Sequence, residues 1–179
     1  RILITINGYY TTKKYIILVF LFSFSISMKH SYSRDKSLNI MKDNILNLTP
    51  RQISLKWIDA YNSHNPDTAT ALYDENVTNT QLPYGKAVHG REAMKKTYEN
   101  LFRAFPDIHI EAENIIEQDS WVVVEWIFQG TMKGEFAGHS PNENKFRMHG
   151  CEIFQVVNGK IFVQHGYWDK NSMFSQLKL

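Results

Sequence analysis

From Thr49 onward, hydrophobic residues recur with the spacing of an α-helix. An amphipathic helix is predicted from there to about Ser63. Thr49 can cap it, Pro50 suits its first position, and Gln52 completes a capping box. The apolar stripe consists of Ile53, Trp57, Ala60 and Tyr61.

Two more helices are expected before residue 107. Asn65-Pro66-Asp67 breaks the first helix and starts a shorter one through Tyr73. A short strand, Val77 to Leu82, follows. A third helix begins at Arg91 and is stopped by Pro106. We expect its apolar residues to pack in the core rather than to line a ligand-binding site. They are Met94, Tyr98, Leu101, Phe102 and Phe105.

From Asp107 the period changes to two, which is typical of strands. Asn158-Gly159 has the composition of a two-residue hairpin turn, and the last strand runs into a short helix. The predicted strands are Ile108–Glu117, Trp121–Met132, Lys145–Val157 and Lys160–Asp169. Helices followed by an antiparallel sheet indicate an α+β fold, in which a strongly curved sheet forms an open cone with an internal pocket.

Residues 1–48 differ in character from the rest of the chain. Two lysines precede an apolar run over residues 15–27, which has the length of a signal peptide and is too short for a stable membrane span. The alternative is upstream sequence translated in frame, with Met28 or Met41 as the start. The protein is exported in the first case and cytoplasmic in the second. We expect a disordered lead-in up to residue 48 and one domain over residues 49–179.

Composition excludes several classes of function. The formal charge of the 179 residues is +2, but residues 41–179 hold fourteen basic and seventeen acidic residues. This mildly acidic domain argues against nucleic-acid binding. The single cysteine, Cys151, excludes an internal disulfide framework and is typical of a buried small hydrophobe. Histidines at ligand spacing and glycine-rich phosphate loops are missing, so we expect neither a metal nor an organic cofactor.

The final strand carries the first candidate chemistry. His165, Tyr167 and Asp169 alternate along it, so they share one pleat face. If that face lines a cavity, it can transfer protons. Asp169 also precedes the last helix and can instead cap it, and strand histidines such as His165 are often structural.

The neighbouring strands supply further candidates. Glu152 lies between apolar residues, and a buried carboxylate needs a partner. His149 lies on the opposite face from Glu152. Trp126 and Phe128 would give the pocket an apolar wall, which raises a carboxylate's proton affinity. Val123 and Ile127 would face outward.

Six segments together resemble one family. They are Trp57-Ile-Asp-Ala-Tyr-Asn, Ala71-Leu-Tyr, His89-Gly-Arg-Glu-Ala-Met, Leu101-Phe-Arg-Ala-Phe-Pro-Asp, Gly134-Glu-Phe-Ala-Gly and Trp168-Asp-Lys-Asn-Ser-Met-Phe-Ser-Gln-Leu. The chain resembles the SnoaL-like polyketide cyclases of the NTF2-like superfamily over residues 50–179. The resemblance implies a cone-shaped α+β barrel, three helices packed in a curved antiparallel sheet, and a homodimer formed through the outer sheet face.

The resemblance also implies a reaction. In these cyclases an aspartate near the end of the last strand is the general acid/base of an intramolecular aldol closure, without metal or organic cofactor. By position this is Asp169, with His165 beside it. Many relatives carry an acidic residue three positions earlier, where this chain has Gly166. If the family's acid belongs there, this chain has lost it at that position.

We therefore expect a cofactor-free ester cyclase or isomerase that binds a small hydrophobic or aromatic molecule. The alternative is a non-catalytic binding or dimerisation module of the same fold. The predicted catalytic residues are Asp169 and His165. The predicted substrate-binding residues are Trp57, Tyr61, Tyr84, Trp126, Phe128, Glu152 and Tyr167.

Overall fold

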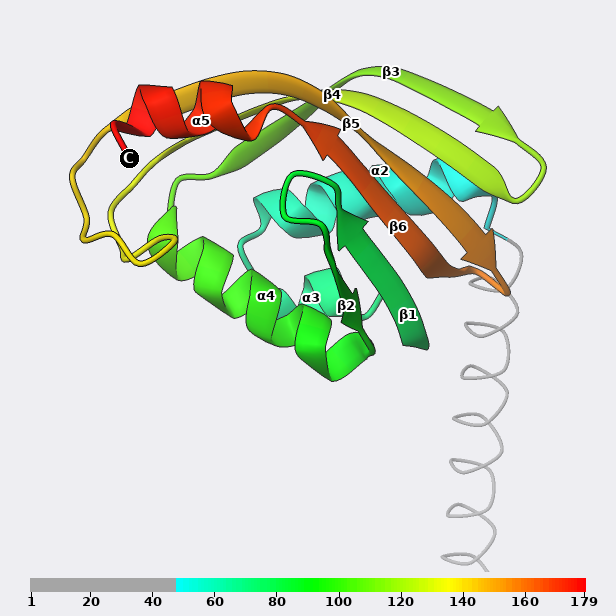
Figure 1. Cartoon of the computed structure of the whole chain (residues 1–179). Helices are drawn as coiled ribbons and strands as arrows, with labels where there is room; N and C mark the ends of the chain where they lie inside the picture. The colour runs from blue at the N-terminus through cyan, green and yellow to red at the C-terminus, as the bar shows by residue number, and fades with distance from the viewer. Residues whose placement is uncertain (1–47) are drawn as a thin grey trace, which may run out of the picture. The chain divides into compact units, whose positions relative to one another are not determined.

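The computed structural model describes residues 48–179, and three helices precede the main strands as expected (Figure 1). The signal-peptide and lead-in predictions concern residues outside this range, apart from residue 48. The elements in order are α2 (Pro50–Asn62), α3 (Pro66–Thr70), β1 (Tyr73–Gln81), β2 (Lys86–His89), α4 (Arg91–Ala104), β3 (His109–Gln118), β4 (Trp121–Thr131), β5 (Lys145–Val157), β6 (Lys160–Trp168) and α5 (Lys170–Leu177).

Local signals determine where several elements begin and end. The Thr49 hydroxyl accepts from the Gln52 amide at 3.3 Å, and the Gln52 side chain accepts from the Thr49 amide at 3.0 Å, which confirms the capping box. Asn158 and Gly159 both have positive φ, 51° and 70°, as the predicted hairpin turn requires. The β5–β6 hairpin therefore closes at Val157 and Lys160.

The sequence prediction is wrong at Tyr73 and misses one strand. The second helix ends at Thr70, and Tyr73 begins β1 instead of ending the helix. The strand β2 was not predicted. Tyr73 is completely buried and pairs with Ile161 of β6, so a long-range strand pairing overrides the local helical pattern.

The six strands form one sheet in the order β2-β1-β6-β5-β4-β3. Strands β3 to β6 make the expected antiparallel meander. The sheet is not entirely antiparallel as predicted, because β1 joins β6 in parallel. Helix α2 packs against β3, β4 and β5, and α4 packs against β1 and β2. The sheet curves around these helices (Figure 1), which confirms the cone-shaped α+β fold.

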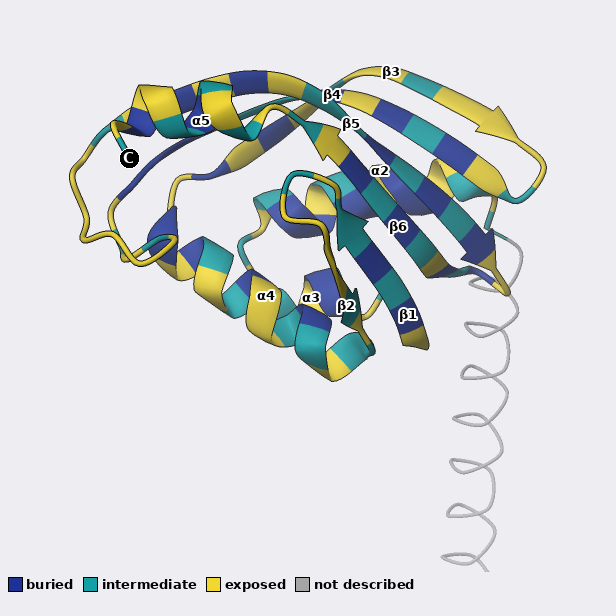
Figure 2. Cartoon of the chain, in the orientation of Figure 1, coloured by how far each residue is buried: buried dark blue, intermediate teal, exposed yellow. Residues whose placement is uncertain are grey.

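The core lies between the helices and the inner face of the sheet. Buried positions alternate with exposed or intermediate positions along much of β4 and β5 (Figure 2). The largest completely buried side chains include Trp57, Tyr73, Phe105 and Phe154. Within residues 48–179 the structure contains no helix with the length and apolarity needed to span a membrane.

The segment after β4 returns to the end of α4 at Gly134. The Gly134 amide donates to the Ala104 carbonyl at 2.9 Å. A Cβ atom on Gly134 would lie 2.9 Å from the carbonyl carbon of Arg103 and 3.0 Å from the Cα of Ala104. Because these are backbone atoms, they cannot move aside cheaply, and the loop requires glycine here.

We predict that Gly134→Ala lowers the free energy of unfolding by about 3 kcal/mol through overpacking against backbone. The control is Gly138→Ala, where φ is +81° but no atom lies within 4 Å of the added Cβ. That variant should lose only about 1 kcal/mol, from the unfavourable backbone conformation. Urea unfolding measures both, and equal losses would contradict the packing argument.

Candidate functional site

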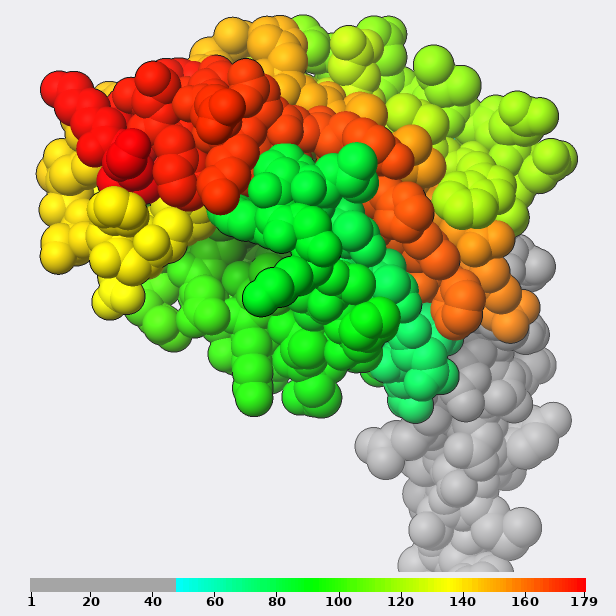
Figure 3. Space-filling view, viewed as in Figure 1, coloured from blue at the N-terminus to red at the C-terminus, as the bar shows by residue number. Residues whose placement is uncertain are grey.

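The inner face of the sheet, helices α2 and α4, and the loop after β4 enclose a cavity of about 620 Å³. In Figure 3 it opens as a recess bordered by α4, this loop and α5. Its lining residues are Trp57, Tyr61, Asn79, Gln81, Tyr84, Met94, Thr97, Tyr98, Asn100, Leu101, Arg103, Ile110, Trp126, Phe128, Glu135, Phe136, Ala137, Met148, Glu152, Gln164, Trp168 and Met173. The volume suits a small organic ligand.

Glu152 is the buried carboxylate of this cavity. It lies on β5 opposite Val124 of β4 and is only 5% exposed. Glu135, the other carboxylate in the lining, is exposed at the mouth. The rest of the wall is largely aromatic and aliphatic. Glu152 is therefore the one acid in the described lining that is shielded from bulk water.

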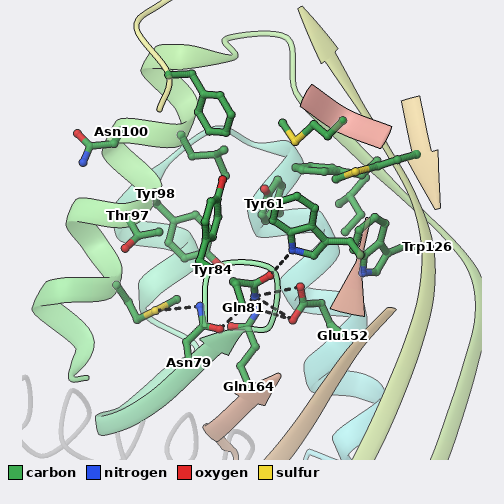
Figure 4. A pocket seen from close by; sticks show the side chains of 18 of the residues that line it. Tyr61, Asn79, Gln81, Tyr84, Thr97, Tyr98, Asn100, Trp126, Glu152 and Gln164 are labelled. Atoms are coloured by element: carbon green, nitrogen blue, oxygen red, sulfur yellow. Dashed lines mark hydrogen bonds between the residues drawn. The ribbon is translucent and has the colours of Figure 1, made fainter. Parts of the chain in front are cut away.

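Two glutamine amides bind the Glu152 carboxylate (Figure 4). Gln164 Nε2 donates to Oε2 at 2.9 Å, and Gln81 Nε2 lies 3.2 and 3.4 Å from the two carboxylate oxygens. Gln81 Nε2 also donates to Asn79 at 3.1 Å. Both amides direct N–H groups at residue 152, so the site favours a hydrogen-bond acceptor such as a carboxylate there.

A second layer of hydrogen bonds orients these two amides. Trp168 Nε1 donates to Gln81 Oε1 at 2.8 Å, which turns the Gln81 nitrogen toward Glu152. The Tyr73 hydroxyl donates to Gln164 Oε1 at 2.8 Å. The donors in this network therefore point toward Glu152 along two converging paths.

The far end of the network lies in the core. Trp57 Nε1 donates to the hydroxyl groups of Tyr73 and Tyr98 at 2.8 and 2.9 Å, and the two hydroxyls lie 2.6 Å apart. Burial is the main cause that raises the pKa of both tyrosines well above the usual range. They therefore remain neutral donors at physiological pH.

Burial also changes the protonation of Glu152. Desolvation raises its pKa from 4.5 to about 7, and the hydrogen bonds from Gln164 and Gln81 oppose part of that rise. Near neutral pH the group therefore exists in both protonation states. A carboxyl group with this property can accept and return a proton without a large energetic penalty.

The structure brings together six of the seven predicted substrate-binding residues. Trp57, Tyr61, Tyr84, Trp126, Phe128 and Glu152 all line the cavity. Tyr167 does not: it lies against Cys151 and Gly150 in a separate hollow on the outer face of the sheet. Val123, which was predicted to face outward, also borders that hollow, and so does His149. The homodimer expected from this outer face stays a prediction.

The structure does not place the two predicted catalytic residues at the cavity. Asp169 is exposed and caps α5, because its Oδ1 accepts from the amides of Asn171 and Ser172 at 2.9 and 3.2 Å. The structure thus agrees with the alternative in which Asp169 caps the last helix. His165 is half-buried and also lies outside the lining. The pleat face that carries both residues is not the one that enters the cavity.

A register shift explains why strict alternation assigns the wrong inner face to β6. Ile161 is completely buried, and alternation from it would place His165 and Asp169 inward. The β5–β6 register shifts between Gln155 and Val156, however, and the inner positions become 164, 166 and 168. Gln164 and Trp168, which reasoning from sequence missed, are therefore in the cavity wall.

Gly166 is the direct partner of Glu152 across the β5–β6 pair. A Cβ atom on Gly166 would overlap the Gln81 amide, so the glycine provides the space in which that amide lies. Position 166 therefore faces the cavity. At this level of the sheet the carboxylate is provided by Glu152 of β5.

Among residues 48–179 no group of three or more metal-ligating side chains is close enough to hold an ion. The cavity lining, as far as the structure describes it, contains neither a phosphate-binding loop nor a basic cluster.

The fold is NTF2-like and encloses an internal cavity. The family model of the SnoaL-like polyketide cyclases matches residues 51–177, and the chain belongs to this family. No curated protein sequence matches the chain significantly.

Solved structures show the same fold at low identity. IdmH of Streptomyces antibioticus, a proposed polyketide cyclase, is 22% identical over 74% of this chain and 100% of its own, with a TM-score of 0.63. AclR of Streptomyces galilaeus, a proposed hydroxylase, is 21% identical over 72% of this chain and 81% of its own, also at 0.63. A Catenulispora acidiphila protein with a ketosteroid isomerase-like fold, in complex with trimethylamine, is 19% identical over 74% of this chain and 95% of its own, with a TM-score of 0.64.

The raised pKa of Glu152 predicts a pH-dependent stability. Between pH 4.5 and pH 7 the unfolded chain ionises this group while the folded protein keeps it protonated, so stability falls as pH rises. Relative to Glu152→Gln, the wild type should lose about 3 kcal/mol of unfolding free energy across this window and then level off. Urea unfolding at several pH values measures it; parallel curves for the two proteins would contradict it.

Removing one amide donor should move the pKa of Glu152 further. Gln81→Leu takes away a hydrogen bond that favours the charged form, so the pKa should rise by about 1. The matched control is Gln129→Leu, an exposed glutamine on β4, which should leave the value unchanged. Carbon-13 NMR of labelled glutamate carboxyl groups measures both. A lower pKa in Gln81→Leu would contradict the role of the amide.

Proposed function

We propose that this protein is a cofactor-free cyclase or isomerase of enolisable ketones or esters, with Glu152 as its general acid/base. The observation that carries the proposal is a single buried carboxylate, with a pKa of about 7, in an otherwise largely apolar cavity. Family membership supports the same reaction class. The fold alone would not, because it carries many activities.

The proposed reaction needs only proton transfer by the protein. The Glu152 carboxylate takes a proton from the carbon beside a substrate carbonyl, and the C–H electron pair forms the enolate. In a cyclisation the enolate carbon then attacks a second carbonyl of the same molecule and forms a C–C bond. Protonated Glu152 returns its proton to the resulting alkoxide, which restores the enzyme.

The hydrogen-bond network supports this cycle. Gln81 and Gln164 both donate to Glu152, and Trp168 and Tyr73 hold them in that orientation. A proton on Glu152 therefore has no acceptor in this pair of amides and is directed into the cavity. The aromatic wall provided by Trp57, Tyr61 and Phe128 fits a hydrophobic or aromatic substrate.

A non-catalytic binding protein is the second candidate. It is favoured by the hydrogen bonds that Glu152 accepts on both oxygens, since a purely structural buried carboxylate has the same requirement. In that case Glu152 would recognise a ligand hydroxyl or amine. The two candidates differ in whether a bound ketone exchanges its protons.

Exchange of α-protons tests the proposal directly. Proton NMR in D₂O would follow 2-tetralone and a panel of aromatic β-keto esters, with and without the protein. We expect accelerated exchange that increases with pH through about 7, as Glu152 ionises. Glu152→Gln should reduce the accelerated rate by about 10² to 10⁴-fold because the base is lost.

The control is Asp169→Asn, which removes the other candidate carboxylate. Because Asp169 caps α5 outside the cavity and asparagine caps a helix equally well, this variant should exchange at the wild-type rate and keep the wild-type stability. A loss of exchange in Asp169→Asn with none in Glu152→Gln would return the catalytic role to Asp169. Ligand binding without exchange in any protein would favour the second candidate.

A further inference from the structure

One buried donor in the cavity wall lacks an acceptor. Trp126 is 3% exposed, and its indole Nε1 makes no hydrogen bond with any residue that the structure describes. The other two indoles in the lining are satisfied: Trp57 donates to Tyr73 and Tyr98, and Trp168 donates to Gln81. Leaving a buried N–H without a partner is costly, so such a group requires an explanation.

Strand register places this donor beside the proposed acid/base. Val124 is opposite Glu152, and Trp126 is opposite Gly150, so Trp126 and Glu152 are diagonal neighbours on the inner face of β4 and β5. In Figure 4 the nitrogen edge of the Trp126 indole faces the side of the cavity where Glu152 lies.

Packing fixes the orientation of the indole. A Cβ atom on Gly150 would lie 2.5 and 2.7 Å from two carbons of the six-membered ring of Trp126. The indole therefore occupies the space that glycine leaves free. The Phe128 ring meets the indole edge to face, with centroids 5.6 Å apart. Because both contacts restrain the ring, the N–H is a positioned donor, and its acceptor must come to it.

We propose that the Trp126 indole N–H donates to the carbonyl oxygen of the substrate and stabilises the enolate oxygen when Glu152 removes the neighbouring proton. This inference rests on the proposed function. It narrows the ligand to a ketone or ester whose carbonyl reaches the β4–β5 wall. Trp126 is then a catalytic residue that acts on the oxygen, while Glu152 acts on the carbon.

The arrangement also explains why the donor is an indole. A neutral N–H cannot neutralise the Glu152 carboxylate, whereas a lysine or arginine at position 126 would form an ion pair with it and lower its pKa. An indole has a donor and no acceptor, so it discriminates in favour of ligand oxygens. The buried N–H would be satisfied only while a carbonyl ligand is bound.

The test is the indole region of the proton–nitrogen NMR spectrum of the full chain. Four tryptophans give four indole signals, and Trp126→Phe identifies the signal of interest. Titration with 2-tetralone should move that signal downfield as the hydrogen bond forms. Tetralin, which has the same rings without the oxygen, should not move it downfield. Trp121, exposed at the start of β4, provides the unperturbed reference signal.

Kinetics gives a second readout. Trp126→Phe keeps an aromatic ring and removes the donor, so α-proton exchange of 2-tetralone should slow by about 10²-fold. Trp121→Phe is the matched control and should exchange at the wild-type rate. If Trp126→Phe does not fold, the wild-type titration still decides, with the Trp126 signal assigned through its contacts to Phe128.

Several outcomes would overturn the inference. One is a Trp126 signal that stays in place while the Trp57 or Trp168 signal shows that 2-tetralone has entered. Another is that none of the indole signals of the cavity tryptophans moves with 2-tetralone or any other carbonyl compound. A third is a free-protein Trp126 signal that follows the ionisation of Glu152 and loses this dependence in Glu152→Gln, since the donor would then belong to the carboxylate.

The results also separate this inference from the proposed function. Exchange that depends on Glu152 without a Trp126 shift would retain the function and remove the role of Trp126. A downfield Trp126 shift without exchange would remove catalysis and leave a carbonyl-binding protein.

Discussion

A carboxylate buried in an aromatic cavity must either lose its charge or be surrounded by donors, and the interior of this protein is arranged around that constraint. Glu152 keeps both options available, because burial raises its pKa to about 7 while Gln81 and Gln164 donate to its oxygens. The amides are themselves held by Trp168 and Tyr73. Changing one member therefore alters the charge state of the site as well as its packing.

The curved sheet makes this arrangement possible because it brings distant segments to one place. Gln81 is at the end of β1, Glu152 is in the middle of β5, and Gln164 is on β6 between them. The parallel β1–β6 pair is essential, since it moves Gln81 beside the hairpin that carries the other two. Gly166 then leaves the space that the Gln81 amide occupies.

Members of this fold share a scaffold while their described activities differ. A proposed cyclase and a proposed hydroxylase both share the fold of this chain, at 22% and 21% identity. Because one fold can carry different activities, the function of this chain must be argued from its own cavity. In this chain the carboxylate enters from β5, beside a buried indole of β4.

The sequence by itself determines much of the local structure. The capping box at Thr49, the Asn158-Gly159 turn, the period-two strands and the inward position of Glu152 all follow from interactions within a few residues or from strict alternation. Family membership and the cone-shaped fold are likewise evident in the motifs. Five aromatic residues expected around the cavity line it for a related reason, since aromatic positions at the right period face the interior.

Only the tertiary structure decides the register shift in the β5–β6 pair, and that shift changes the candidate site. It exchanges the faces of β6, so Gln164 enters the cavity and Asp169, which caps α5, does not. Such an irregularity arises when two strands adjust to the curvature of a whole sheet, and neither strand carries a local signal for it. The pairing of Tyr73 with Ile161 is a second example, because a contact between residues far apart in sequence outweighs the helical pattern around Tyr73.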